Sequence, residues 1–498
     1  MQEIELKFLV PQDRLKGLMR QVNIKSSQTT PMMAHYFDTQ KQELAAAGIG
    51  LRIRQEGATW VQTIKAGGDG IAARLEHNTV LDTDHVQAML ADNNLLPDLT
   101  LYKDTAIAPA LADFKLKKLA KNLTRRYVTD VQRTTRMLED DSGEHINSIE
   151  MAYDYGAIIH GCDDTQRQAI QEIEFELIAG ELDFLFATAK TWCKRYKLCL
   201  STVTKAERGG LLINKQAYSP AVEADLTLLQ VNKKSNLPEF IRAVVHNCLL
   251  QILPNSSAIA DGSKDIHHAI QLAHGLSRLS TALQTFGKFS EQLNNEWLGI
   301  IKQTTTALDE YISTAYMITD IETLLEQQGA PSLDWSTDIA QIKLAPSDAI
   351  CTNDFQLTLL ELIEFVMSHT SAEPQADKLA IDKLSKILAK KQANLLQSEQ
   401  DNSGDIHQQL TEVRYIAEFA APLYPRKASK RWMKHLAKAQ KSLEMYQQQL
   451  NYQQRYQQKS VTNPEALYGA GWLAATLPEQ QQRWQKHLHR LHECPIFW

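Results

Sequence analysis

The sequence predicts an α+β protein built in two parts, with antiparallel strands first and helices after them. Up to about Gly210, short runs of alternating polar and apolar residues are separated by turn signals, as in strands and hairpins. After Pro220 the chain becomes rich in Leu, Ala, Gln and Lys with helical periodicity, and glycine becomes rare. We therefore expect a strand-rich domain over residues 1–210, a linker over 211–220 and an all-helical domain over 221–498.

The composition limits the class of protein before any motif is considered. The chain has 498 residues, of which 43% are hydrophobic and 22% charged, so it is long enough for two or more cored domains. Its formal net charge of -6 argues against a general nucleic-acid coat. The six cysteines are scattered without a CxxC pair, which indicates a reduced protein without a structural zinc site. No signal peptide or membrane span is evident, and we predict a cytoplasmic protein with neither nucleic-acid nor membrane partners.

The first expected strand runs from Glu3 to Phe8 and places charged and apolar side chains on opposite faces. Charged alternation of this kind returns later in the same half of the chain. The later stretches are 51–54, 60–65, 74–76, 129–133, 149–154 and 172–177. Two helical stretches, at about 82–93 and 182–196, interrupt the series.

The charged faces of these strands carry arginine, lysine and glutamate at i and i+2. The solvent-exposed face of an ordinary antiparallel sheet would carry mixed polar residues instead. If the sheet closes into a barrel, one charged face becomes an enclosed interior, which is costly unless the charges are paired or matched by a ligand. The cations, which suit an oligophosphate, are Lys7, Arg52, Arg54, Lys65, Arg74, Arg133, Lys205 and Arg208. The carboxylates, which suit the divalent ions that phosphates bring, are Glu3, Glu5, Glu76, Glu150, Asp154, Glu172 and Glu174. The alternative for any single pair is a surface salt bridge on a solvated face.

The ordered series resembles the CYTH domain, which is the fold of the triphosphate tunnel metalloenzymes. The matching positions are Glu3-x-Glu5-x-Lys7, Arg52-x-Arg54, Lys65, Arg74-x-Glu76, Asp154, Glu172-x-Glu174 and Lys205. The resemblance implies an eight-stranded antiparallel β barrel with flanking helices and a charged tunnel. In that family the tunnel binds a linear triphosphate with a metal ion, usually Mg²⁺ or Mn²⁺. Its members hydrolyse tripolyphosphate, hydrolyse thiamine triphosphate or cyclise ATP.

The resemblance also implies roles for individual residues. The phosphate oxygens would be held by Arg52, Arg54, Lys65, Arg74 and Arg133, with Lys7 and Lys205 as further cationic contacts. The metal ligands would be Glu3, Glu5, Asp154, Glu172 and Glu174. Glu5, Lys7 and Lys205 would be catalytic, with Glu5 orienting or deprotonating the attacking water. Glu76 is a ligand or an anchor for Arg74, and Glu150 and Arg208 are further candidates. Arg125, Arg126 and Arg136 are alternatives to Arg133 as the tunnel-facing arginine.

The helical half resembles the CHAD domain, which often follows a CYTH domain. The points of likeness are Arg278 to Leu283, Arg414-Tyr415, Ala439 to Leu443 and Phe497-Trp498. The resemblance implies a basic surface for polyphosphate, but this chain departs from it. The positions where basic residues would be expected hold Ile270, Ala273, Ser277, Ser280, Thr411 and Glu412. Polyphosphate and a protein partner therefore stay open as alternatives for this half. The apolar positions that start at Phe240 predict a first helix that stops at Pro254.

Three smaller signals have simpler explanations than a binding site. Two are histidine groups that could suggest a metal: His267, His268 and His274, and His487, His489 and His492 with Cys494. We interpret both groups as polar or core helix positions. The lysine run over 427–441 is interpreted as a solvated helix face.

The most specific expectation is an inorganic triphosphatase, which hydrolyses tripolyphosphate to pyrophosphate and phosphate with the help of a metal. A thiamine triphosphatase or a class IV-type adenylyl cyclase is the enzymatic alternative, and each would need an element that recognises a base. A non-catalytic polyphosphate-binding or scaffold protein is the alternative from another class. The sequence lacks GxxxxGK[ST], so a P-loop NTPase is not supported.

Overall fold

The computed structural model describes residues 2–68, 70–141, 146–340, 342, 344–368, 373–400 and 406–498. The chain divides into two compact units. The first unit comprises Met1–Val222, Leu253–His268 and Ile350–Glu364, and the second comprises Glu223–Ile252, Ala269–Ala349 and Phe365–Trp498. None of the helices in the described ranges has the length and apolar character that crossing a bilayer requires.

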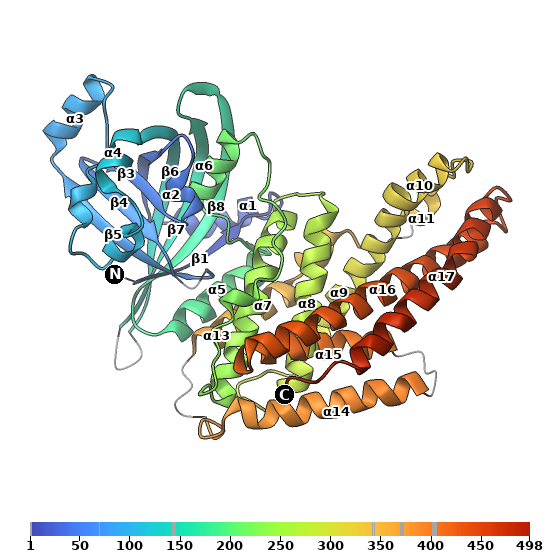
Figure 1. The fold of residues 1–498 in the computed structure, drawn as a ribbon. Helices are drawn as coiled ribbons and strands as arrows, with labels where there is room; N and C mark the ends of the chain where they lie inside the picture. The colour runs from blue at the N-terminus through green and yellow to red at the C-terminus, as the bar shows by residue number, and fades with distance from the viewer. Residues whose placement is uncertain are drawn as a thin grey trace. The chain divides into compact units, whose positions relative to one another are not determined.

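Eight antiparallel strands of the first unit close into a barrel, which confirms the expected fold (Figure 1). The strand order is β5-β4-β3-β2-β6-β7-β8-β1, and pairing of β1 with β5 closes the ring. The strands are β1 (Gln2–Leu9), β2 (Gln28–Asp38), β3 (Gly50–Glu56), β4 (Thr59–Ala66), β5 (Ala73–Leu81), β6 (Thr124–Asp140), β7 (Asn147–His160) and β8 (Asp163–Ala179). A two-residue strand, β9 (Cys199–Leu200), adds to β1 outside the ring. Closure depends on β1, whose first residues pair with β5 and whose later residues pair with β8.

Helices cover the outer face of the barrel, where the apolar side chains of the strands lie. Trp60 and Ile64 of β4 belong to a buried cluster with Val86 and Leu119. These two come from α3 (Thr83–Ala91) and α4 (Leu116–Asn122). Each large apolar side chain buried in this way contributes roughly 1.5–3 kcal/mol. The apolar residues are therefore used outside, and the alternate positions of the strands are left to point inward.

The same arrangement holds on the opposite wall of the barrel. Phe8 of β1 contacts Phe175 of β8, with 5.9 Å between ring centroids. Phe175 in turn contacts Trp192 of α5 (Leu182–Tyr196) at 5.5 Å. Because side chains alternate along a strand, the outward Phe8 leaves Lys7 on the inner face. The remaining α-helices before residue 222 are α1 (Leu15–Val22), α2 (Glu43–Ala46) and α6 (Lys205–Ile213).

Strand β2 is the barrel strand that the charge pattern did not predict. Between Gln28 and Phe37 it contains no Asp, Glu, Lys or Arg, and it includes Pro31. Within a sheet, proline is usually found on an edge strand, because it has no N–H to donate. Strand β2 nevertheless pairs with both β3 and β6. Its cavity-facing residues include the uncharged Thr30, Met32 and Tyr36, so charged alternation could not reveal it.

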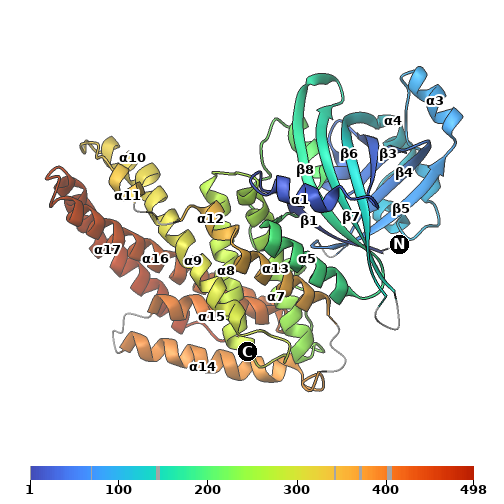
Figure 2. The same ribbon diagram turned by 180° about the vertical axis from the view of Figure 1, so that it is seen from behind.

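The chain after residue 222 is helical, as expected. Its helices are α7 (Leu237–Ala260), α8 (Ile266–Phe286), α9 (Glu296–Tyr316), α10 (Glu322–Gln327), α11 (Ser336–Ala340), α12 (Pro346–Ile350), α13 (Asn353–Met367), α14 (Ala380–Gln400), α15 (Ile406–Ala420), α16 (Arg426–Lys459) and α17 (Ala466–His492). Figure 2 shows the two long helices α16 and α17 side by side in the second unit. The last two aromatic residues fold back on this unit, since Trp498 lies 4.9 Å from Trp432 between ring centroids.

The prediction that the first long helix stops at Pro254 is wrong, because α7 continues to Ala260. A proline removes one intrahelical hydrogen bond, but contacts within the first unit hold the last turns. Asn255 exchanges two hydrogen bonds with the backbone of Val222, at 2.8 and 3.1 Å. The hydroxyl of Ser257 accepts a hydrogen bond from the backbone N–H of Thr202 at 3.0 Å. Tertiary contacts of this kind leave no trace in local sequence.

Candidate functional site

A cavity of about 1120 Å³ lies inside the barrel, and all eight strands and α6 contribute to its lining. Most of the predicted site residues line it. They are Glu3, Glu5, Lys7, Arg52, Arg54, Lys65, Arg74, Glu76, Arg133, Glu150, Glu174 and Lys205. Asp154 and Glu172 are not in this lining and are 0% and 1% exposed. The charged face of the strands is therefore the interior face, as a closed barrel requires.

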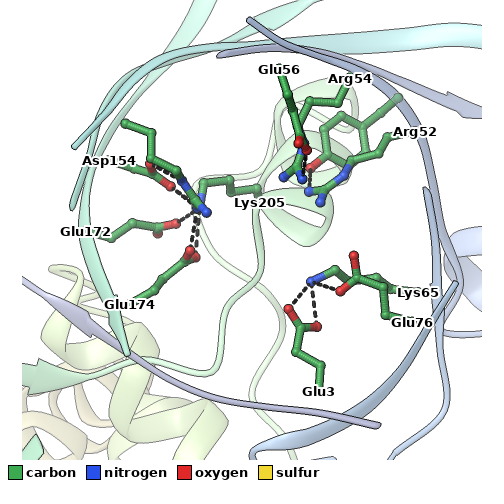
Figure 3. A network of polar contacts seen from close by, with 12 residues as sticks. Glu3, Arg52, Arg54, Glu56, Lys65, Glu76, Asp154, Glu172, Glu174 and Lys205 are labelled. Carbon is green, nitrogen blue, oxygen red and sulfur yellow. Dashed lines mark hydrogen bonds and ion pairs between the residues drawn. The ribbon is translucent and has the colours of Figure 1, made fainter. Parts of the chain in front are cut away.

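An acidic cluster of three carboxylates occupies the wall formed by β7 and β8 (Figure 3). Asp154 lies opposite Glu172 in the strand pairing, and Glu174 follows on the same face. Lys205, at the start of α6, places its Nζ 2.8 Å from Asp154 Oδ2 and 2.8 Å from Glu174 Oε1, and it also pairs with Glu172. We call Asp154, Glu172 and Glu174 the acidic cluster.

Arg133 of β6 binds the acidic cluster from the other side. Its Nε donates to Asp154 Oδ1 at 2.8 Å, and its Nη2 contacts Asp154 Oδ2 and Glu174 Oε2, each at 2.6 Å. Burial opposes ionisation of these acids, yet the two cations hold the pKa of Asp154 below its usual value and that of Glu174 well below it. The pKa of Lys205 is raised well above its usual value, because the three carboxylates outweigh burial. Lys7 of β1, which lies opposite Glu174 in the strand pairing, is a third cation that helps to lower the pKa of Glu174.

A second polar group surrounds Lys65 on the opposite wall, as Figure 3 shows. Lys65 Nζ lies 2.6 Å from Glu3 Oε2 and 2.9 Å from Glu76 Oε2. Burial raises the pKa of Glu3 to about 8, and Lys65 only partly offsets this. The pKa of Glu76 shifts in the opposite direction, because the charge of Lys65 outweighs the effect of burial and lowers it to about 2. Burial also raises the pKa of Glu176 to about 7, with Glu5 adding to the effect. This wall holds more carboxylates than cations.

The third wall is cationic. Arg52 Nη1 donates to the Tyr36 hydroxyl at 3.2 Å, and Arg54 forms an ion pair with Glu56. Burial and the neighbouring Arg52 lower the pKa of Arg54 to about 10. Although burial opposes it, the guanidinium of Arg52 lowers the pKa of the Tyr36 hydroxyl. The lowered pKa of Tyr36 reports a surplus of positive charge on this wall, which an anion in the cavity would relieve.

The structure distinguishes the four arginines that the sequence left open. Arg133 and Arg126 line the cavity. The pairing of β2 with β6 skips Arg126, and such a bulge turns its side chain inward out of the alternation. Arg136 instead donates to the backbone oxygen of Gln21 at 3.0 Å. Arg125 acts on His35, whose pKa falls to about 4 mainly through burial.

The cavity lining differs from the predicted site residues at two further positions. Arg208 is not in the cavity lining, and its Nη2 lies 3.4 Å from Asp261 Oδ2. Glu176 lines the cavity but was not among the candidates. The sequence does contain a pattern that could have identified Glu176, because it continues the two-residue spacing of Glu172 and Glu174. Tyr36 and Thr63 are lining residues for which the sequence gave no charge signal.

The acidic cluster fits a divalent metal ion. One carboxylate oxygen from each of its members lies within 4.8 Å of the others. An all-carboxylate donor set suits hard ions such as Mg²⁺ and Mn²⁺. Lys205 holds the same oxygens, so an ion there would share the acids with it. Across the described residues, neither histidine group singled out in the sequence forms a comparable cluster.

Comparison with known families matches both halves of the chain. The CYTH domain model matches residues 1–209, and the CHAD domain model matches residues 243–457. A curated protein of Haemophilus influenzae named inorganic triphosphatase is 31% identical over 222 residues. That match covers 43% of this chain and 56% of the relative, so it spans little more than half of the relative's length.

Two solved structures are similar to parts of the chain. The CHAD domain from the plant Ricinus communis is 19% identical, covering 56% of this chain and 98% of that one, with a TM-score of 0.46. A Hippeastrum protein, described as an adenylyl cyclase with a dominant triphosphatase activity, is 16% identical, covering 44% and 98%, with a TM-score of 0.30.

Proposed function

Because this chain belongs to the proteins that join a CYTH domain to a CHAD domain, we propose that it is a metal-dependent inorganic triphosphatase. The proposed reaction converts tripolyphosphate to pyrophosphate and phosphate inside the barrel, and we assign it to the cytoplasm. The observation that carries the proposal is the cavity itself, whose lining sets arginines and lysines against clusters of carboxylates. A site for a plain anion would need the cations but not the acids.

In the proposed reaction the cations bind the substrate. Arginine forks take two phosphate oxygens at once, and Arg52 and Arg54 lie together on one wall for this purpose. Further cationic contacts come from Lys7, Lys65, Arg74, Arg133 and Lys205. Their fixed positions neutralise the charge that develops on the phosphate oxygens, which lowers the barrier without reorganising solvent.

The carboxylates hold the metal and the water. A divalent ion bound by the acidic cluster, or by Glu3 and Glu5, would act as a Lewis acid toward the phosphate oxygens. Glu5 orients the attacking water or accepts its proton. The placement of Glu5 and Lys7 two residues apart on β1 puts a base and a phosphate-binding cation on the same inner face.

The size of the cavity is the reason to test the enzymatic alternatives. About 1120 Å³ exceeds the roughly 300–1,000 Å³ of ordinary small-molecule pockets, so an organic triphosphate has room to enter. Thiamine triphosphate and ATP therefore belong in the same assay.

The test is turnover by the full chain with Mg²⁺ or Mn²⁺. Tripolyphosphate, thiamine triphosphate and ATP are supplied separately, and phosphate and cyclic AMP are measured. We expect phosphate release to be fastest from tripolyphosphate. Absence of turnover with all three substrates and both metals would leave only the non-catalytic binding or scaffold role.

Two variants test the assignment of the interior face. Glu5→Gln and Lys7→Ala should each abolish turnover while leaving the melting temperature within a few degrees. The matched controls are Asp13→Asn and Lys16→Ala, which change exposed residues close by in the sequence and should leave turnover unchanged. If both interior variants kept full activity, the roles of β1 in the site would be wrong.

A further inference from the structure

Helix α6 carries two buried cations, one turn apart, and each has its own acid. Lys205 contacts the acidic cluster, and its side chain is 11% exposed. Arg208, three residues later, contacts Asp261 at 3.4 Å between Nη2 and Oδ2, and its side chain is 6% exposed. A buried charge without a partner is strongly unfavourable, so each cation is held to its acid.

The side of α6 that faces the barrel wall is fixed by Tyr127. The Tyr127 hydroxyl donates to the backbone oxygen of Ala206 at 3.0 Å. At Gly209, an added Cβ would lie 2.2 Å from the Tyr127 ring, so the helix already lies against that ring. The hydroxyl of Thr204 caps the helix by accepting from the N–H of Glu207 at 3.0 Å. These contacts fix the position of α6 against the barrel wall. The Arg208–Asp261 pair adds another fixed contact one turn after Lys205.

Asp261 comes from a different part of the chain. It directly follows α7, in the segment Leu253–His268 of the first unit, and its backbone N–H donates to Ser257 O at 3.0 Å. The segment lies outside the CYTH match and within the CHAD match. Asp261 is also close enough to Glu172 for the two negative charges to affect each other. The Arg208–Asp261 pair therefore lies within electrostatic range of Glu172, a member of the acidic cluster.

We propose that Asp261 is a positioning residue for the reaction in the barrel. By neutralising Arg208, it fixes α6 and prevents Arg208 from turning toward Glu172 in competition with Lys205. This inference rests on the proposed triphosphatase function. Its consequence is that a residue of the helical half completes the arrangement of the catalytic lysine.

The test compares Asp261→Asn with the wild-type full chain by two independent measurements. Turnover of tripolyphosphate should fall about 10- to 100-fold in kcat, as for other residues that orient a catalytic group, with a smaller change in KM. Hydrogen exchange of the peptide 205–213 should become faster, because the anchor of α6 is lost. Asp265→Asn is the matched control, since its side chain is 52% exposed in the same segment, and it should change neither measurement.

Two further variants keep the inference open to refutation if Asp261→Asn folds poorly. Asp261→Glu should restore most of the activity, since it keeps the charge. Arg208→Met combined with Asp261→Asn removes both charges and should be less impaired than Asp261→Asn alone.

The outcomes separate the two proposals. If the wild type hydrolyses no triphosphate, the function fails, and the exchange measurement still tests whether Asp261 anchors α6. If Asp261→Asn leaves exchange in α6 unchanged, the positioning role is overturned, whatever happens to kcat. A double variant more impaired than Asp261→Asn would also overturn it.

Discussion

Arginines with little exposed surface occur in both compact units, but their surroundings differ. In the second unit, Arg278 is 2% exposed and donates to Gln251 Oε1 at 3.0 Å and to Asn247 Oδ1 at 2.8 Å. Its guanidinium also lies 5.3 Å from the centre of the Phe419 ring. Amide oxygens, a ring and the Glu418 carboxylate, 3.8 Å from its Nε, surround it, and it does not line the barrel cavity.

Arg414 is 35% exposed, but it too pairs with neighbours in the second unit. Its Nε donates to Glu418 Oε1 at 2.7 Å, and its Nη1 donates to Gln440 Oε1 at 2.8 Å. In the barrel, by contrast, Arg52, Arg54 and Arg133 make their pairs along the wall of a large cavity. Burial alone therefore does not indicate an anion site. What matters is whether the charged face is turned toward open space or toward partners from the same chain.

The largest effect that would sharpen this comparison is expected at Lys205. Lys205→Met removes the cation that touches all three members of the acidic cluster and leaves their charge poorly compensated. We expect kcat for tripolyphosphate to fall at least about 10²–10³-fold. Lys190→Met is the control, because Lys190 forms a partly exposed pair with Glu364 and such pairs contribute little. Similar activities in the two variants would contradict the assignment of Lys205 to the site.

A second variant tests the role of a buried arginine in the second, helical unit. Arg278→Met should lower the free energy of unfolding by about 3–5 kcal/mol, since it breaks a buried polar network. The folded fraction should keep its kcat, because Arg278 is not in the cavity lining. Urea unfolding and turnover, measured on the same preparation, check this. A loss of turnover at unchanged stability would show that the two groups of arginines do not differ as described.

The smallest effect concerns the outer face of the barrel and depends on pH. His35 is 4% exposed, stacks on Trp60 at 6.2 Å, and has a pKa lowered to about 4. Between pH 6.5 and 4 the unfolded chain binds a proton at this site and the folded chain does not, so the free energy of unfolding falls as the pH is lowered. His35→Phe should remove up to about 3 kcal/mol of this decrease. Parallel unfolding curves at pH 7 and pH 4.5 measure the difference, and an unchanged pH dependence would contradict it.

The sequence predicted what depends on local periodicity. Charged alternation on β1, β3, β4, β7 and β8 correctly placed the interior face, because a strand turns every second side chain the same way. It could not place Arg126, since a bulge breaks the alternation there. The alternation also misplaced Arg208. Side chains repeat every 3.6 residues in the helix α6 and not every two as in a strand, and the partner of Arg208, Asp261, is distant in sequence. The roles proposed for the lining residues stay predictions until the variants are measured.

The way the barrel closes has a consequence for folding. Besides the two-residue β9, strand β1 pairs with β5 and with β8, and β8 follows β7 much later in the chain. Pairing over such a separation is slow, because the intervening chain must be ordered before the contact forms. Until β8 is available, β1 has an unpaired edge with an apolar side that is open to association with other chains. The strand that brings Glu5 and Lys7 to the cavity is thus expected to be among the last to dock, and the polar interior forms only when the ring closes.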